Sequence, residues 1–542
     1  MSATPRARRG LTRLGRRVTR ALASLLAAAV LVPVAACSAD SAGGGGEEDT
    51  APRPGTVRVL ASSELADMEP LLEQARKATG ITVRPTWTGT IDAVAQITSG
   101  QAEKAYDAVW LSSNDYLRLH PDAAGRLGSE TPLMASPVAI GVRPQTVERL
   151  GWKPEQVTWA QVHRAVTEGG LTYGMTDPVR SNSGFSALIS VASALSGAQA
   201  ALTDADVRRA GPKLKEFFAG QRLTSGSSGW LATAYARRGN VDALINYESV
   251  LHSLNRDSGT GLTVIRPRDG VVTADYPLSL LSGASPDAKD SVRALTTYLR
   301  TPAVQRRMTA DTFRRPVVAS VAAASPLAAG QRRELPFPGT RSVADGLLSG
   351  YENKLRRPSR TVYVLDTSGS MEGDRLRRLK DALDGLTADF REREEVTLLP
   401  FGSSVKRATT HTVDPARPEE GLKAIRADAA SLTASGDTAI YSSLADAYDR
   451  IGTDTGSAFT SIVLMTDGQN TTGDTAAEFT AFYRGLPAAR QVTPVFPVVF
   501  GDSDRSELDR IAELTGGRLF DATKAEGPGS LDGAFEEIRG YQ

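Results

Sequence analysis

The sequence predicts an α/β protein with two folded domains, and three observations carry this prediction. Segments with strand character alternate with segments of helical periodicity along both halves of the chain. At 542 residues the chain is too long for one ordinary hydrophobic core. Hydrophobic residues make up 41% and charged residues 23%, a composition typical of globular proteins. We expect domains over residues 56–326 and 358–542, joined by a connector over 327–357.

The N-terminus has the pattern of a signal sequence. A cluster of arginines precedes residue 21, and an apolar run follows from Ala21 to Ala36. This run is shorter than the roughly 20 apolar residues that span a bilayer as a helix, and its length is typical of a signal peptide. The run ends in Val34-Ala35-Ala36-Cys37, and Cys37 is the single cysteine of the chain.

Small residues before a cysteine resemble the lipobox of bacterial lipoproteins. This resemblance implies that residues 1–37 are a lipoprotein signal peptide and that lipid on Cys37 holds the protein on the extracellular face of the cell membrane. An ordinary secretory signal with an incidental cysteine is the alternative. Residues 38–55 contain Gly43–Gly46 and almost no bulky apolar side chain, so they predict a flexible linker.

Charge and motifs argue against several classes of function. The formal net charge is +1, and seven arginines precede residue 21, so the rest of the chain is mildly acidic and gives no reason to expect nucleic acid as a partner. The sequence has no zinc-protease, nucleophile-elbow, Walker A or dinucleotide motif. Its histidines are scattered, at His120, His163, His252 and His411. We therefore expect a binding protein and not an enzyme.

The first domain begins with three expected strands, at residues 56–60, 81–86 and 107–111. A helical repeat of apolar residues lies between the first two and ends at Gly80. Thr158 and Gln161 match a capping box for a helix that begins at Trp159. The alternation favours a mainly parallel sheet.

Small polar residues gather directly after the expected strands and at the start of a helix over 185–195. Ligands of open α/β sheets bind at the carboxyl ends of the strands, and free amides at a helix start favour polar ligands. For Ser183 alone, a simple helix cap is the competing interpretation. The candidate solute-binding residues are Ser62, Ser63, Ser112, Ser113, Ser181 and Ser183.

Several segments of this domain resemble extracellular solute-binding proteins that serve ABC importers. They are Tyr106–Trp110, Ser136–Gly141, Thr176–Pro178 with Ser181–Gly184, Ile245–Ser249, Tyr276-Pro277 and the helix around Leu299–Met308. The resemblance implies a two-lobed, periplasmic-binding-protein-like fold that closes around a small polar solute. It also implies an ABC permease as a partner.

The second domain predicts a doubly wound α/β fold. A nearly continuous apolar strand, Arg360–Leu365, runs into Asp366-Thr-Ser-Gly-Ser-Met371, and a helix with one leucine-rich face follows. Further strands are expected at 396–401, 461–465 and 495–500, with helices between them that include 439–451 and 506–515.

The Asp366-x-Ser368-x-Ser370 pattern at a strand end offers hard oxygen ligands for a divalent cation. Taken alone, the same pattern also fits a loop that caps a helix. With the Gly436-Asp-Thr438-Ala439 and Leu464-Met-Thr-Asp467-Gly468 segments, it resembles the metal-ion-dependent adhesion site of von Willebrand factor A (VWA) domains, which have a Rossmann-like fold.

This second resemblance implies one Mg²⁺ or Mn²⁺ ion held by a set of five residues, in which the two aspartates bind directly or through water. They are Asp366, Ser368, Ser370, Thr438 and Asp467. An open coordination position would accept an acidic side chain from a protein partner. We expect a lipid-anchored surface protein that binds such a partner; the alternative is the substrate-binding component of an ABC importer with an accessory VWA domain.

Overall fold

The computed structural model describes residues 55–123, 125–327, 333–387, 394–414, 417–452, 458–499, 504–523 and 531–541. The predicted signal peptide, Cys37 and nearly all of the predicted linker lie outside the described residues. Within those ranges, no helix has the length and apolar character needed to cross a membrane.

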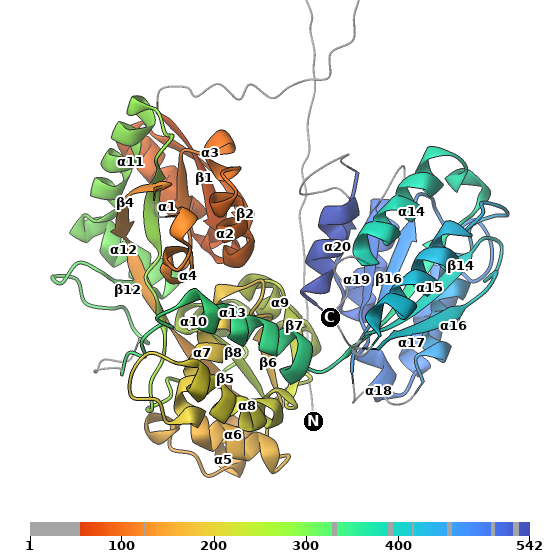
Figure 1. Ribbon diagram of the computed structural model, residues 1–542, viewed down its shortest axis with the longest axis horizontal. Helices are drawn as coiled ribbons and strands as arrows, with labels where there is room; N and C mark the ends of the chain where they lie inside the picture. The colour runs from red at the N-terminus through yellow and green to blue at the C-terminus, as the bar shows by residue number, and fades with distance from the viewer. Residues whose placement is uncertain are drawn as a thin grey trace, which may run out of the picture. The chain divides into compact units, whose positions relative to one another are not determined.

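The first lobe is built on a five-stranded sheet in the order β2-β1-β3-β11-β4 (Figure 1). Strand β1 (Thr56–Ser62) pairs in parallel with β2 (Thr82–Thr88) and β3 (Ala108–Trp110), as the sequence predicts. Strand β11 (Pro277–Leu281) pairs antiparallel with β3 and with β4 (Leu127–Pro132). The sheet is therefore mixed and not mainly parallel, because the chain returns to it from the second lobe through β11.

The second lobe contains a seven-stranded sheet whose main path is β10-β5-β8-β6-β7. Strand β6 (Tyr173–Thr176) pairs in parallel with β7 (Gln221–Ser225) and β8 (Ala243–Tyr247). Strand β5 (Met134–Val142) is antiparallel to β8 and also pairs with three short strands. The short strands are β9 (Thr263–Ile265), β10 (Thr273–Ala274) and β12 (Arg315–Pro316).

One continuous hydrophobic core runs through both lobes. Helix α7 (Asn182–Ser196) is almost entirely buried in it, which explains its unbroken run of small and apolar residues. The predicted capping box is confirmed: Thr158 N donates to Gln161 Oε1 at 2.9 Å and Gln161 N donates to Thr158 Oγ1 at 3.1 Å. Within the predicted connector, α13 (Arg341–Gly350) and a π-helical turn (Tyr351–Leu355) form a helix whose apolar face joins this core.

The remaining helices of residues 55–327 surround the two sheets (Figure 1). They are η1 (Ser63–Met68), α1 (Glu69–Thr79), α2 (Thr90–Thr98), α3 (Ala102–Ala105), α4 (Asp115–Arg118), η2 (Pro121–Ala123), α5 (Pro144–Arg149), η3 (Pro154–Gln156), α6 (Trp159–Thr167), α8 (Asp204–Phe218), α9 (Ser228–Arg238), α10 (Glu248–Ser258), α11 (Pro286–Leu299) and α12 (Pro302–Thr312).

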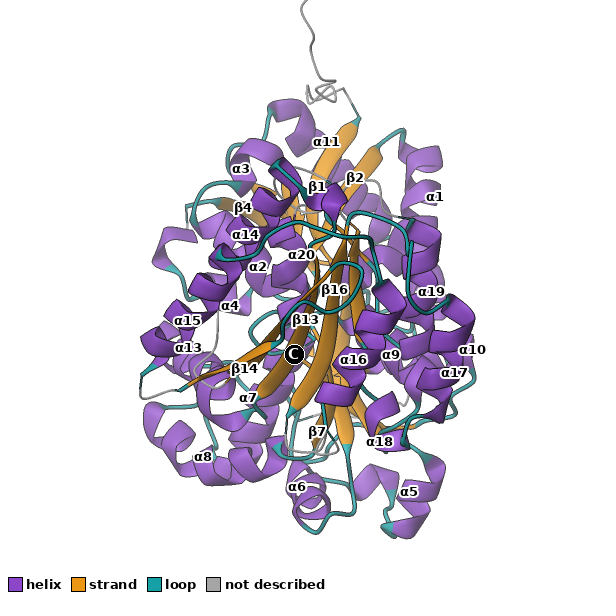
Figure 2. Cartoon of the chain, turned by 90° about the vertical axis from the view of Figure 1, so that its right-hand side faces the viewer, coloured by secondary structure: helices purple, strands orange, loops and turns teal. Residues whose placement is uncertain are grey.

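The C-terminal domain has a six-stranded sheet in the order β15-β14-β13-β16-β17-β18, parallel except for β15. Helices cover both faces of this sheet, which confirms the doubly wound prediction (Figure 2). One apolar layer includes Leu379, Ile425 and Phe535, and the other includes Leu444, Phe479 and Leu508. Because both faces are covered, strand β13 is an almost unbroken apolar run.

The elements of this domain follow the predicted order with boundaries within a few residues. The strands are β13 (Ser359–Asp366), β14 (Glu394–Phe401), β15 (Thr409–Val413), β16 (Phe459–Thr466), β17 (Val495–Val499) and β18 (Phe520–Asp521). The helices are η5 (Gly369–Met371), α14 (Asp374–Leu386), α15 (Pro418–Ala430), α16 (Ile440–Arg450), α17 (Ala476–Gly485), α18 (Ala488–Gln491), α19 (Arg505–Thr515) and α20 (Leu531–Arg539).

Candidate functional site

Two aspartates meet at the carboxyl edge of the C-terminal sheet. Asp366 is the last residue of β13, and Asp467 directly follows β16. The two strands are parallel neighbours with Leu365 opposite Met465, so the register brings both carboxylates to the same edge. Both residues are buried, with exposed fractions of 0% for Asp366 and 2% for Asp467. The sequence spacing alone could not give this proximity, because it depends on the pairing of strands that lie about a hundred residues apart.

The hydroxyls of the first loop connect the two carboxylates. The backbone amide of Ser368 donates to Asp366 Oδ1 at 2.8 Å. The Ser368 and Ser370 hydroxyl oxygens lie 3.0 Å apart, and the Ser370 hydroxyl donates to Asp467 Oδ1 at 2.9 Å. The structure therefore brings four of the five predicted metal residues into one hydrogen-bonded chain.

The fifth predicted residue, Thr438, lies two residues before α16 and is 5% exposed. Its backbone amide donates a hydrogen bond to the Thr471 hydroxyl oxygen at 2.9 Å. A methyl group placed on Gly468 would lie 3.9 Å from Thr438 Oγ1, so this hydroxyl faces the residue that follows Asp467. Gly369 N donates to Gly436 O at 2.8 Å and ties the first loop to the threonine loop. The three loops therefore converge at one place.

Three further residues of this site were not singled out by sequence reasoning. The Thr466 hydroxyl donates to Asp366 Oδ2 at 2.6 Å. Arg375, in the first turn of α14, places Nη1 2.5 Å from Asp467 Oδ2. Lys406 Nζ donates to the carbonyl oxygens of Thr367 and Thr433 at 2.7 and 3.0 Å and so joins two of the loops. Each contact joins distant segments, so no local sequence pattern reports it.

Burial dominates the electrostatics of the site. It raises the pKa of Asp366, and the nearby charge of Asp467 acts in the same direction, while hydrogen bonds from Ser368 and Thr466 oppose the rise. Burial also lowers the pKa of Lys406, against the attraction of Asp366. Two carboxylates packed this closely favour a positive charge between or beside them.

The donor set is two carboxylates and three hydroxyls, which are hard oxygen ligands. Across the described ranges, no three His, Cys, Asp or Glu side chains gather as a metal-binding group. Histidine and thiolate, which suit zinc and copper, therefore play no part in this set. The residues that are present fit a small hard divalent cation such as Mg²⁺ or Mn²⁺.

Two clusters of buried hydroxyls lie in the two lobes of the N-terminal part. In the first lobe, Thr90 Oγ1 lies 2.8 Å from both Ser62 Oγ and Ser112 Oγ. In the second lobe, Ser183 Oγ lies 2.7 Å from both Thr176 Oγ1 and Ser228 Oγ. All six hydroxyls bond to one another within their cluster.

The other predicted solute residues have local roles as well. Ser181 Oγ lies 3.1 Å from Ser183 Oγ, and Ser181 is the residue before α7, although its side chain makes no cap bond. Ser183 lies inside the first turn and is not the cap. Ser113 Oγ accepts a hydrogen bond from the amide of Asp115 at 3.1 Å, and Ser63 begins the short helix η1 and is half-buried.

Two buried tyrosines lie between the hydroxyl clusters, and sequence reasoning did not single out either as a ligand. Asn182 Nδ2 donates to Tyr247 Oη at 2.9 Å. Burial raises the pKa of Tyr247, and hydrogen bonds with Asn182 and with Ser112 of the first lobe oppose part of this rise. The Tyr247 and Tyr276 rings lie 6.0 Å apart, and Tyr276 N donates to Ser112 O at 3.0 Å. These contacts connect the two clusters across the junction of the lobes.

Comparison with known proteins agrees with this division of the chain. Residues 57–314 match the family described as bacterial extracellular solute-binding protein. Residues 361–469 match the family described as von Willebrand factor type A domain, and that range contains all five predicted metal residues. The chain joins a bacterial extracellular solute-binding domain to a VWA domain.

Individual relatives match about a quarter of the chain or less. Inter-alpha-trypsin inhibitor heavy chain H4 of Sus scrofa is 28% identical over 124 residues, which are 22% of this chain and 13% of that protein. The chain therefore spans a small part of the length of that curated relative. The protein of the same name from Homo sapiens is 28% identical over 146 residues, 25% of this chain and 16% of that protein.

Solved structures of low sequence identity match parts of the chain. The periplasmic binding protein AfuA from Actinobacillus pleuropneumoniae, with exogenous fructose-6-phosphate bound, is 13% identical with a TM-score of 0.46, over 56% of this chain and 99% of that one. A von Willebrand factor type A protein from Catenulispora acidiphila is 19% identical with a TM-score of 0.28, over 34% of this chain and 42% of that one.

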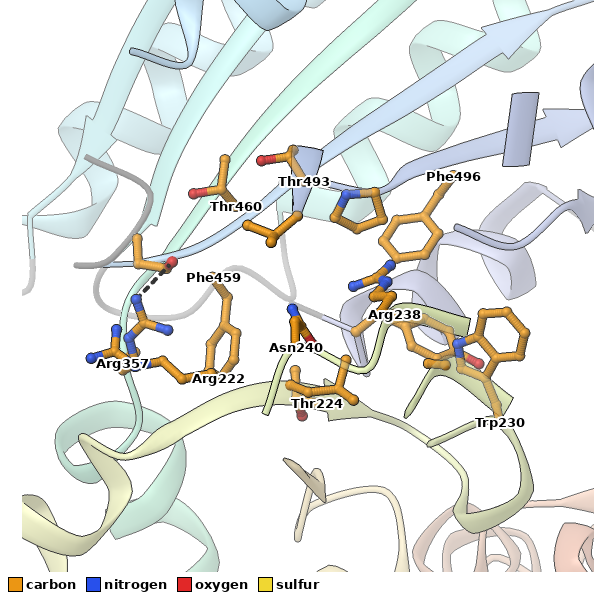
Figure 3. Close-up of a pocket in the computed structure, with 16 residues that line it drawn as sticks. Arg222, Thr224, Trp230, Arg238, Asn240, Arg357, Phe459, Thr460, Thr493 and Phe496 are labelled. Carbon is orange, nitrogen blue, oxygen red and sulfur yellow. Dashed lines mark hydrogen bonds between the residues drawn. The ribbon is translucent and has the colours of Figure 1, made fainter. Parts of the chain in front are cut away.

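A separate cavity of about 230 Å³ is lined by none of the predicted solute-binding or metal-binding residues (Figure 3). The side chains that line this cavity include three arginines and three aromatic residues, which are Arg222, Arg238, Arg357, Trp230, Phe459 and Phe496. Burial lowers the pKa of Arg238 to about 10, and its Nε donates to the carbonyl oxygen of Gly516 at 2.9 Å.

Proposed function

We propose that the VWA domain binds one divalent cation, Mg²⁺ or Mn²⁺, and uses it to capture an acidic side chain of a protein partner. The observation that carries the proposal is the convergence of Asp366, Ser368, Ser370, Thr438 and Asp467 at one sheet edge. Five oxygen-bearing side chains from three loops meet there, with only two carboxylates among them; four are buried, and Ser370 is exposed.

The balance of ligands supports a role in binding an outside acid. Ser368, Ser370 and Thr438 would bind the ion directly, and Asp366 and Asp467 directly or through water. The three hydroxyl ligands carry no charge, so an aspartate that binds only through water leaves part of the ion's charge uncompensated, and this charge would attract a partner's carboxylate. A third protein carboxylate in the set would weaken that attraction.

We propose that the solute-binding domain holds a small polar solute near the hydroxyl clusters of Ser62 and Ser112 in one lobe and Ser183 in the other. The buried hydroxyls, together with Tyr247 and Asn182 between them, support this proposal because they present neutral donors and acceptors from both lobes. Within each cluster the hydroxyls bond to one another, so a solute must exchange for some of these bonds.

We also propose that the protein is lipid-anchored through Cys37 on the extracellular face of the membrane. This places both binding domains at the cell surface. The match of residues 57–314 to extracellular solute-binding proteins favours a second candidate function, in which the chain delivers solute to an ABC permease and the VWA domain is an accessory.

Calorimetric titration of the full-length protein with Mn²⁺ and Mg²⁺ tests the proposed function of the VWA domain. We expect one saturable site that Asp366→Ala removes, and retention of an acidic partner protein from the cell surface that chelator reverses. The absence of any saturable binding that depends on Asp366 would contradict the proposal.

A further inference from the structure

Arg375 occupies an unusual position beside the proposed metal ligands. It is the second residue of α14, so its backbone is fixed just beyond the loop that carries Ser368 and Ser370. Its Nη1 lies 2.5 Å from Asp467 Oδ2, and its side chain is 36% exposed while that of Asp467 is fully buried. The Arg375 side chain therefore extends from the protein surface to the buried carboxylate of Asp467 in the third loop.

Both oxygens of Asp467 are engaged in this arrangement. Oδ1 accepts the Ser370 hydroxyl at 2.9 Å and Oδ2 accepts Arg375. Charge-assisted bonds of this kind are stronger than neutral ones, and they are strongest where one partner is shielded from water. A divalent cation held by Ser370 and Asp467 would lie close to the guanidinium, and two positive charges at such short range repel each other.

We propose that Arg375 competes with the divalent cation for Asp467 and thereby weakens metal binding. This inference rests on the proposed metal site. In this mechanism the cation gains Asp467 only as the guanidinium leaves it, and the long, partly exposed side chain turns toward solvent beside the ion. The arginine then offers a second positive group, with paired N–H donors, at the place where an acidic partner would dock.

Arg377 provides a matched control for Arg375. It lies on the same helix, and its Nη2 contacts Asp374 Oδ1 at 3.1 Å, with 67% and 83% of the two side chains exposed. Replacing either arginine by alanine removes one positive charge from α14. Only the Arg375 variant frees a proposed metal ligand, so a difference between the two variants reports the contact with Asp467 and not the net charge of the helix.

The test is calorimetric titration of the full-length protein with Mn²⁺, and in parallel with Mg²⁺. The variants are Arg375→Ala, Arg375→Gln and Arg377→Ala, with Asp366→Ala as the blank. We expect both Arg375 variants to bind Mn²⁺ about tenfold more tightly than Arg377→Ala, a difference of ~1.4 kcal/mol. In chelator, Arg375→Gln should melt at a lower temperature than Arg377→Ala, and Mn²⁺ should raise its melting temperature by more.

The outcomes separate this inference from the proposed function. If the wild type and all arginine variants bind Mn²⁺ equally, the competition is refuted and the metal site stands. If the Arg375 variants bind more weakly, the arginine supports the site and the inference is also wrong. Binding by the Arg375 variants with none in the wild type would support competition, whereas no binding in any variant would overturn both proposals.

Discussion

The contribution of Asp366 to metal binding can be separated from its contribution to stability by two substitutions. Its carboxylate accepts the Ser368 amide at 2.8 Å and the Thr466 hydroxyl at 2.6 Å, and all three residues are buried. Asp366→Ala removes both acceptors. Asp366→Asn keeps an oxygen for the Ser368 amide and removes the charge beside Asp467. We expect both variants to lose metal binding and only the alanine variant to lose stability.

The expected loss of stability follows from those two hydrogen bonds. A buried donor without an acceptor costs about 1–3 kcal/mol. The Thr466 hydroxyl can reorient toward Gly468 O, 3.5 Å away, whereas the Ser368 amide has a fixed direction. Loss of a buried carboxylate that is repelled by Asp467 offsets part of this cost. We therefore expect a net destabilisation of ~1–3 kcal/mol for Asp366→Ala, or about 2–4 °C per kcal/mol for a domain of this size.

Scanning calorimetry of the full-length protein, in chelator and in Mn²⁺, measures both effects. In the wild type, Mn²⁺ should raise the temperature of one melting transition, which identifies the VWA domain. In chelator, that transition should fall for Asp366→Ala and should not fall for Asp366→Asn. A Mn²⁺-dependent shift in either variant would refute the assignment of Asp366 as a ligand, and an equal fall in both would refute the hydrogen-bond argument.

Three other predictions concern the rest of the chain. Cys37→Ala should move the protein from the membrane fraction to the medium or leave it unprocessed, as fractionation would show; normal processing with membrane retention would refute the lipid anchor. A screen of sugar phosphates and oxyanions should find a solute that raises the melting temperature of the wild type. Ser183→Val should weaken binding of that solute, whereas Ser63→Val, at the half-buried start of a helix, should weaken binding less. Equal effects of the two substitutions would count against the Ser183 cluster. Burial raises the pKa of Asp275 from its ordinary 3.8 to about 6, so its protonated form stabilises the fold below about pH 4 and this contribution is lost as pH rises through about 6. Asp275→Asn should therefore stabilise the protein by ~1–3 kcal/mol at pH 8 and by almost nothing at pH 4 in urea unfolding, and a stabilisation independent of pH would contradict the assigned cause.

The order of elements in the VWA domain could be predicted from sequence because each pattern is local. Apolar runs such as Arg360–Leu365 mark strands with both faces covered, and the predicted elements lie within a few residues of those in the structure. The grouping of Asp366 with Asp467 came from the resemblance of their loops to the adhesion site of VWA domains, and the parallel pairing of β13 with β16 brings both residues to the carboxyl edge. Arg375 and Lys406 could not be placed, since their contacts depend on how a helix and a distant loop pack against that edge.

The first domain shows the limit of local patterns more clearly. Alternation of strands and helices correctly indicates an α/β fold, but the mainly parallel sheet that it favours is wrong for the first lobe. The chain leaves the first lobe at β4 and β5 and returns at β11, and this return makes the first sheet mixed. Likewise, serines after strands could be identified, but their partners Thr176 and Ser228 lie on other segments and emerge only with the folded lobe.

The charges around the proposed metal site explain why its affinity would be set by residues outside the ligand set. Asp366 and Asp467 supply the negative charge, and Arg375 and Lys406 supply positive charge at the same sheet edge. Lys406 is held by two backbone carbonyls that it joins, so its charge is fixed in place. Arg375 is partly exposed and bonds Asp467 itself, so its charge is the one that can leave. A divalent ion that displaces the Arg375 guanidinium from Asp467 raises the local positive charge. A nearby acidic group can then bind both the ion and the released guanidinium. Metal binding and partner binding would thereby favour each other through a single side chain.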